Sequence, residues 1–287
     1  MVTEGIALLA ALSYALFTVY GWFGLQYSTP LVATIVSLSA RTLTLWSAVA
    51  LTGGIPEVAP LALWVFIGLG LLQSATSLLT FVGLQKIGSA RSQPLRNTYP
   101  LWSALLAVTI MREDAGPTIM AGTLLVVAGV VLISWKPEAR PVGYRWSHTL
   151  YSLAAGMLAG IAFPLRRYGL TLSNEPVFFA AVVAVVSLWG AVPYVVWSRA
   201  GRRAVWHSRG IIHFAASGFF EAMGALLSLI ALGSGRVVVV SPIVATTPLW
   251  NLLITAMFLR AKDDIHARTI TGTAAVVLGT IAIALGR

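Results

Sequence analysis

Hydrophobic residues occur in long runs, separated by short segments rich in charged residues, proline and glycine. Dividing the chain at those segments gives ten candidate membrane spans: 5–25, 31–52, 61–85, 88–111, 117–135, 147–169, 176–197, 210–232, 236–259 and 266–285. Each run has roughly the 20 apolar residues that a transmembrane helix needs. The runs do not alternate between apolar and polar positions, as the strands of a membrane barrel do. The pattern therefore predicts an all-α membrane protein with ten transmembrane helices.

The composition excludes a single water-soluble domain. Of the 287 residues, 58% are hydrophobic and 10% are charged, whereas soluble domains carry about 25% charged residues. The mean hydropathy is +0.86. No segment between the spans is long enough to fold as a soluble catalytic domain. The chain has no cysteine, which excludes disulfides, cysteine zinc sites and a cysteine nucleophile.

The basic residues predict how the chain is oriented in the membrane. The formal net charge is +10, but the Lys and Arg residues are spread between apolar runs, so we expect no nucleic-acid partner. Of the 19 Lys and Arg residues, 5 fall on the side of Met1 and 12 on the opposite side, while Arg41 and Arg96 lie within spans. The positive-inside rule then places both termini on the non-cytoplasmic side of the cell membrane, plasma or inner.

An internal repeat is the most specific signal in the sequence. Residues 94–105 read PLRNTYPLWSAL and residues 242–253 read PIVATTPLWNLL. At an offset of 148 residues the two segments share two prolines, two leucines, a threonine and a tryptophan. After a two-residue slip, the offset also relates two glycine pairs of seven-residue spacing: Gly122 and Gly129, and Gly272 and Gly279.

Each copy of the repeat holds five spans, which determines how the copies relate. Because five is odd, the second copy enters the membrane from the opposite side. We therefore predict two inverted five-helix repeats, residues 1–138 and 139–287. This architecture is typical of secondary transporters, whose substrates bind near the midplane between the halves.

Together these features resemble the drug/metabolite transporter superfamily, and the EamA-type ten-helix exporters most of all. The resemblance rests on the two five-helix halves, Arg41 in the second span, the prolines of spans four and nine, and a G-x6-G helix ending each half. It also includes Glu113 after span four, although the second half has Ala261 at the matching position. The resemblance implies efflux or exchange of small metabolites, with amino-acid exporters of the YddG-like branch as one subgroup.

Four prolines predict bends in spans four and nine. Proline within a helix removes a hydrogen bond and clashes with the preceding turn, and the freed carbonyls need a partner or a wet cavity. The bends fall at matching depths in the two halves, so we expect two broken or kinked helices that line the substrate cavity and act as gates. The residues are Pro94, Pro100, Pro242 and Pro248.

Charged side chains within the spans are candidates for substrate or proton binding, because a charge at mid-membrane is costly without a partner. Glu221 lies halfway along span eight, with Gln73 as its repeat partner. It could bind a substrate ammonium group or a proton, or form a structural ion pair with Arg41 or Arg96. Arg96 offers a guanidinium that suits a carboxylate or phosphate, whereas we expect Arg41 to brace the fold.

Further candidates are aromatic and neutral polar residues near the prolines. Trp102 and Trp250 are repeat-related and could stack on a planar substrate. Hydrogen bonds to the substrate could come from Tyr14, Gln73, Tyr99 and Asn251, and Asn97, next to Arg96, is a further candidate for the substrate site. The paired glycines predict close helix packing instead.

No metal or nucleotide motif occurs, so we expect no metal and no cofactor. We therefore expect a secondary active transporter or exporter of small metabolites, most of all amino acids, driven by the substrate gradient or by protons. A channel and an intramembrane enzyme are the alternatives. One chain contains both halves, so a monomer suffices.

Overall fold

A computed structural model of the chain describes residues 2–87, 89–134, 145–197, 205–258 and 267–286, and within these ranges it is helical with no strand. In the first half the helices are α1 (Val2–Leu25), α2 (Pro30–Leu51), α3 (Pro60–Ile87), α4 (Ser89–Arg96), α5 (Tyr99–Thr109) and α6 (Pro117–Ser134). In the second half a 3-10 turn, η1 (Trp146–His148), precedes α7 (Thr149–Leu172), α8 (Pro176–Trp197), α9 (Ser208–Ser234), α10 (Val237–Val244), α11 (Thr247–Phe258) and α12 (Ala267–Leu285). Every predicted span contains helix.

Spans four and nine are each interrupted by a turn. The first break falls at Asn97–Thr98, between α4 and α5, and the second at Ala245–Thr246, between α10 and α11. Pro94 and Pro242 lie inside the short helices that precede the breaks. Pro100 and Pro248 are the second residues of the helices that follow, a position where a missing N–H costs nothing.

Both breaks have the same local geometry. The hydroxyl of Thr98 donates to the carbonyl of Leu95 over 2.7 Å, and the hydroxyl of Thr246 donates to the carbonyl of Ile243 over 2.7 Å. These residues correspond at the repeat offset of 148. The same two carbonyls also accept from the backbone N–H groups of Thr98 and Thr246, over 3.4 and 3.1 Å, so each threonine holds the end of the preceding helix with two hydrogen bonds.

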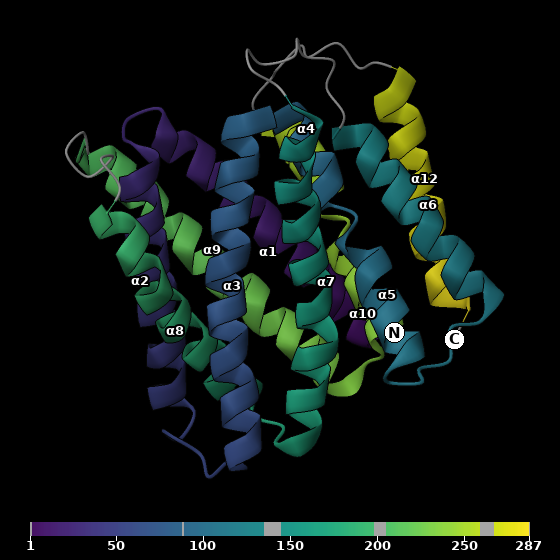
Figure 1. Ribbon diagram of the computed structural model, residues 1–287, viewed down its shortest axis with the longest axis horizontal. Helices are drawn as coiled ribbons and strands as arrows, with labels where there is room; N and C mark the ends of the chain where they lie inside the picture. Colours follow the sequence, from purple (N-terminus) through teal and green to yellow (C-terminus); the bar gives the residue numbers. More distant parts are fainter. Residues whose placement is uncertain (1, 88, 135–144, 198–204, 259–266, 287) are drawn as a thin grey trace.

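The long helices of one half pack on those of the other (Figure 1): α1 lies along α9, and α7 lies along α3. Gly24 of α1 leaves space for the ring of Phe214, and Gly169 of α7 leaves space for the ring of Phe66. Helices α2 and α8 pack against each other, α2 also packs on α9, and α8 also packs on α3 and α9. The chain thus forms one bundle in which the two halves interlock.

Helices α6 and α12 form a separate close pair at the edge of the bundle. They cross at the four glycines predicted to pack. A Cβ on Gly129 would lie 2.5 Å from the carbonyl oxygen of Gly272, and one on Gly122 would lie 2.7 Å from that of Gly279. Only glycine lets the two backbones approach this closely.

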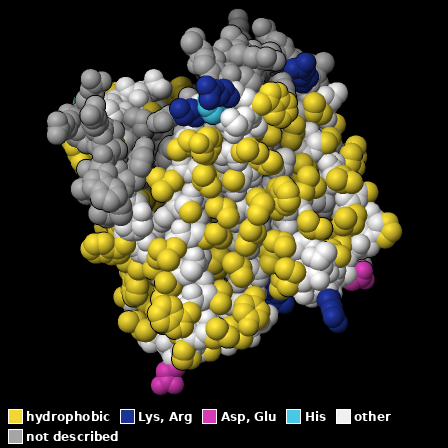
Figure 2. Space-filling model, in the orientation of Figure 1, with side chains coloured by type: hydrophobic (Ala, Val, Ile, Leu, Met, Phe, Trp, Pro, Cys, Tyr) yellow, Lys and Arg dark blue, Asp and Glu magenta, His cyan; other side chains and the backbone are white. Residues whose placement is uncertain are grey.

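The surface suits a lipid bilayer. Figure 2 shows a broad hydrophobic band between two ends, with Lys and Arg side chains mostly at one end of the visible face. Six of the described helices are long and apolar enough to cross a membrane: α1, α2, α3, α6, α7 with η1, and α9. Shorter apolar helices lie in predicted spans seven, nine and ten, and predicted span four contains the short helices α4 and α5. The count of ten spans therefore stays a prediction.

The packing of α6 on α12 gives the first prediction. We expect Gly129→Ala to lower the melting temperature of the purified protein in detergent, because the added methyl group collides with the backbone of α12. The matched control is Gly68→Ala in α3, where a Cβ meets nothing within 4 Å. Alanine stabilises a helix by about 1 kcal/mol relative to glycine, so Gly68→Ala should leave the melting temperature unchanged or raise it. Equal effects of the two substitutions would contradict the packing.

Candidate functional site

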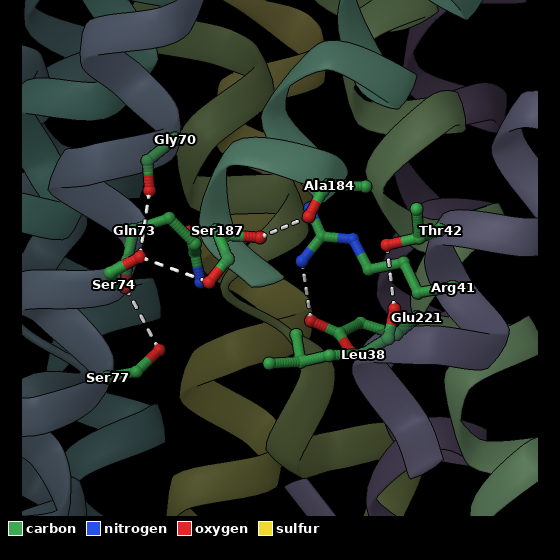
Figure 3. A network of polar contacts seen from close by, with 10 residues as sticks. All are labelled: Leu38, Arg41, Thr42, Gly70, Gln73, Ser74, Ser77, Ala184, Ser187 and Glu221. Atoms are coloured by element: carbon green, nitrogen blue, oxygen red, sulfur yellow. Dashed lines mark hydrogen bonds and ion pairs between the residues drawn. The ribbon is translucent and has the colours of Figure 1, made fainter. Parts of the chain in front are cut away.

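An ion pair buried between α2 and α9 lies at the centre of the candidate site. The Nη1 of Arg41 donates to the Oε1 of Glu221 over 2.9 Å, and the two side chains are 4% and 15% exposed. Figure 3 shows the pair beside α8. Arg41 therefore neutralises the carboxylate of Glu221. Of the three roles that the sequence allowed for Glu221, binding ammonium, binding a proton or pairing with an arginine, the structure contains the ion pair with Arg41.

Polar residues of α3 and α8 adjoin the ion pair (Figure 3). The hydroxyl of Ser74 donates to the carbonyl of Ser187 over 3.2 Å, which joins the two helices. Gln73, the repeat partner of Glu221, precedes Ser74 in α3, and its side chain is partly buried. The Nε of Arg41 is buried without a hydrogen-bond partner, so one donor of this guanidinium has no acceptor within the described chain.

Arg96 is the last residue of α4, where the first break begins. Its backbone lies against α7, because a Cβ on Gly156 would be 3.0 Å from the carbonyl oxygen of Arg96. The side chain is partly exposed and within electrostatic range of Tyr99 and Glu221. Among the residues that the structure describes, no carboxylate pairs with this guanidinium.

Arg166 is a site residue that the sequence analysis missed. It is one of the 5 basic residues that the charge count assigned to the side of Met1, yet it lies inside α7, six residues before Leu172. Its guanidinium carbon is 5.6 Å from the centre of the Phe163 ring, on which the ring of Tyr99 also stacks at 5.5 Å. Its position within the predicted span 147–169, two residues after Pro164, was the signal that could have revealed it.

Tyr14 lies near both the Arg41–Glu221 ion pair and Arg166. Its ring packs on Gly224 of α9, one turn after Glu221. It lies within electrostatic range of Arg166, Arg41 and Glu221. Tyr99 lies within the same range of Tyr14, Arg96 and Arg166. The structure thus brings the predicted residues Tyr14, Arg96, Tyr99 and Glu221 into one interior cluster, together with Arg41 and Arg166.

The remaining candidates divide into two groups. The indole nitrogen of Trp250 and the amide oxygen of Asn251 are buried without a hydrogen-bond partner, which often marks a place for water or a ligand. In contrast, Asn97 donates to the hydroxyl of Ser134 over 3.1 Å, at the end of α6. Trp102 packs on α7, where a Cβ on Gly160 would lie 2.5 Å from its Cβ. Asn97 and Trp102 are therefore anchored by structural contacts at the first break.

The start of α10 is held by the first half of the chain. The two carboxylate oxygens of Glu113 accept hydrogen bonds from the backbone N–H groups of Val237 and Val238, over 2.9 and 3.0 Å. Arg236 donates to the carbonyl of Asp114 over 2.8 Å. A carboxylate at a helix N-terminus is favourable because the N–H groups there have no partner within the helix. The loop between α5 and α6 thus fixes one end of the second broken span.

The remaining ionisable residues do not suggest metal chemistry. No group of three His, Asp or Glu residues that could hold a metal occurs in the described ranges. Arg167, the neighbour of Arg166, donates to the carbonyls of Leu232 and Gly233, over 2.7 Å in each case, and so secures the end of α9.

Comparison with known proteins now identifies the first half of the chain. Residues 2–135 match the model of the EamA-like transporter family. This region is an EamA-like transporter domain. The resemblance drawn from the sequence is therefore confirmed over these residues, and the protein is a multi-pass membrane transporter of small molecules. Transport, not enzymatic catalysis, is the activity of this family.

One solved crystal structure extends the fold comparison to the whole chain. It is 16% identical, covers 99% of this chain and 96% of its own, and superposes with a TM-score of 0.82. At this identity the likeness shows the fold alone. No curated protein matches the sequence.

The buried ion pair gives the second prediction. We expect Arg41→Gln or Glu221→Gln to destabilise the protein by about 3 kcal/mol, because each leaves one buried charge without its partner. The double variant Arg41→Gln/Glu221→Gln removes both charges and should lose less than the sum of the two. Thermal unfolding in detergent measures all three. Strictly additive losses would mean that the two side chains do not act as a pair.

Proposed function

We propose that this EamA-like protein is a secondary active exporter of small metabolites, most of all amino acids, and that it works by alternating access between residues 1–138 and 139–287. The observation that carries the proposal is the pair of broken spans, α4–α5 and α10–α11, which share one turn geometry. Discontinuous helices of this kind build the substrate sites of many secondary transporters. Here the first break places Arg96 and Tyr99 in the interior cluster of charges.

Matched packing contacts support the idea that the two halves are inverted repeats. Phe66 and Phe214 correspond at the offset of 148, and each ring fills the space left by a glycine of the other half. Gly70 and Gly218 correspond at the same offset, and they too are matched in their contacts. Gly70 contacts Val183 and Val186 of α8. Gly218 contacts two residues of α2, and each of these lies 146 positions before its counterpart in α8.

Alternating access follows from this symmetry. If both halves can adopt either of two packings, exchanging the packings moves the opening of the site from one face to the other. Glu113 holds the start of α10, and Ala261 at the corresponding position of the second half has no carboxylate with which to hold the start of α4. The conformation open to one side of the membrane is therefore held by different contacts from the conformation open to the other side.

The remaining parts of the proposal concern energy, partners and orientation. Transport uses the substrate gradient or protons, and a proton role for Glu221 requires its pair with Arg41 to open during the cycle. One chain suffices, with the lipid bilayer and the substrate as its partners and no nucleic acid. Both termini lie on the non-cytoplasmic side of the plasma or inner membrane, as the bias of Lys and Arg residues indicates.

Counterflow in liposomes tests the function and separates it from the alternatives. We expect vesicles that contain the protein and are preloaded with an unlabelled amino acid to take up the same labelled amino acid faster than unloaded vesicles, with saturation. A carrier returns faster when loaded, whereas the flux through a channel gains no such acceleration. An intramembrane enzyme would convert a labelled lipid instead. The absence of counterflow with every amino acid of a full panel would contradict the amino-acid proposal.

A matched pair of variants serves as the control for counterflow. A Cβ on Gly160 would lie 2.8 Å from the carbonyl oxygen of Tyr99, so Gly160→Leu displaces the first break. It should abolish counterflow, while Gly68→Leu, at the lipid-facing surface of α3, should retain it.

A further inference from the structure

The interior cluster holds more positive than negative charge. Arg41, Arg96 and Arg166 contribute three guanidinium groups, and Glu221 is the carboxylate within electrostatic range of the cluster. Glu221 is already paired with Arg41 at 2.9 Å. Arg96 and Arg166 thus have no carboxylate partner among the residues that the structure describes.

The two unpaired arginines approach the same aromatic residue from different helices. Arg96 ends α4, with its backbone against Gly156, and Arg166 lies ten residues beyond Gly156 in α7. Ten residues of helix span about 15 Å. Tyr99, stacked on Phe163, is within electrostatic range of both guanidinium groups. Both side chains are partly exposed rather than sealed in packing.

Unpaired guanidinium groups inside a membrane protein are costly, and they are commonly compensated by pairing or by a water-filled pathway. A guanidinium can bind a carboxylate or a phosphate through two parallel hydrogen bonds. Gly156, which contacts the backbone of Arg96, and Arg166 lie about 15 Å apart along α7, so the two arginines enter the cluster from different positions along that helix. Two acid groups on a short carbon chain match this arrangement.

We propose that the site takes small organic anions with two acid groups, one held by Arg96 and the other by Arg166. This inference rests on the proposed transport function and names its substrate class: dicarboxylates and acidic amino acids rather than neutral or basic ones. Glu221 does not bind a substrate ammonium group in this arrangement, because Arg41 occupies it. The aromatic stack of Tyr99 on Phe163 lies beside the carbon chain between the two acid groups.

Binding to the purified full-length chain in detergent tests the proposal. Glutarate and L-glutamate should raise the melting temperature, whereas L-leucine and L-lysine should not. Arg96→Gln and Arg166→Gln should each weaken glutarate binding by about tenfold or more, since each removes one charge-assisted contact. The matched control is Arg167→Gln, which removes the neighbouring positive charge but breaks only contacts with the end of α9. It should lower the melting temperature of the free protein without changing the glutarate affinity.

The wild-type selectivity keeps the test decisive even if a variant fails to fold. Equal stabilisation by leucine, lysine and glutarate, or no response to either dianion, would overturn the proposal. A lipid headgroup also carries acid groups, so the titration is repeated in micelles of phosphatidylcholine and of phosphatidylglycerol. Stabilisation by phosphatidylglycerol with no response to glutarate would assign the arginines to lipid and overturn the proposal as well.

The binding and counterflow experiments fail independently. Counterflow of neutral amino acids without dianion binding would leave the transporter in place and remove the substrate class. Dianion binding that depends on Arg96 and Arg166, without counterflow of any dianion or amino acid, would retain the site and remove the transport cycle.

Discussion

The cost of charge in a low-dielectric interior governs this molecule. Arg41 and Glu221 satisfy each other across α2 and α9, and so the ion pair ties the two halves together at the level of the site. Arg96 and Arg166 lack such a partner within the described chain, although both lie within electrostatic range of Tyr99. The interior is neutral at the Arg41–Glu221 pair and positive at Arg96 and Arg166. It is therefore suited to a ligand that supplies the missing negative charge.

The broken spans place that positive charge where a ligand can reach it. A continuous helix satisfies its own backbone groups and exposes only side chains, whereas a break ends the helix and turns a polar residue inward. Threonine hydroxyls add a second hydrogen bond to one carbonyl at each break, and glycines of α7 let the first break lie close against that helix. The same residues that interrupt the spans thus determine where Arg96 and Tyr99 lie.

Much of the fold could be predicted from the sequence, since lipid imposes long apolar runs and the repeat doubles the signal. The predicted spans agree closely with the helix bounds, and the prolines located both interruptions. The contacts within the site could not be predicted as well as the fold. Pairing of Arg41 with Glu221 depends on which helices of opposite halves meet, which the sequence does not specify. Arg166 was missed because a guanidinium near the end of a span resembles a loop residue, and the contact of Asn97 with Ser134 depends on where α6 ends.

The most direct measurement is an experimental structure of the full-length protein with bromosuccinate, whose bromine is located by anomalous scattering. The account predicts one bromine beside Tyr99, between the first break and α7, with the two carboxylates at hydrogen-bonding distance, about 3 Å, from Arg96 and Arg166. A structure in which those two guanidinium groups instead extend to the lipid headgroups, with no anion between them, would contradict it.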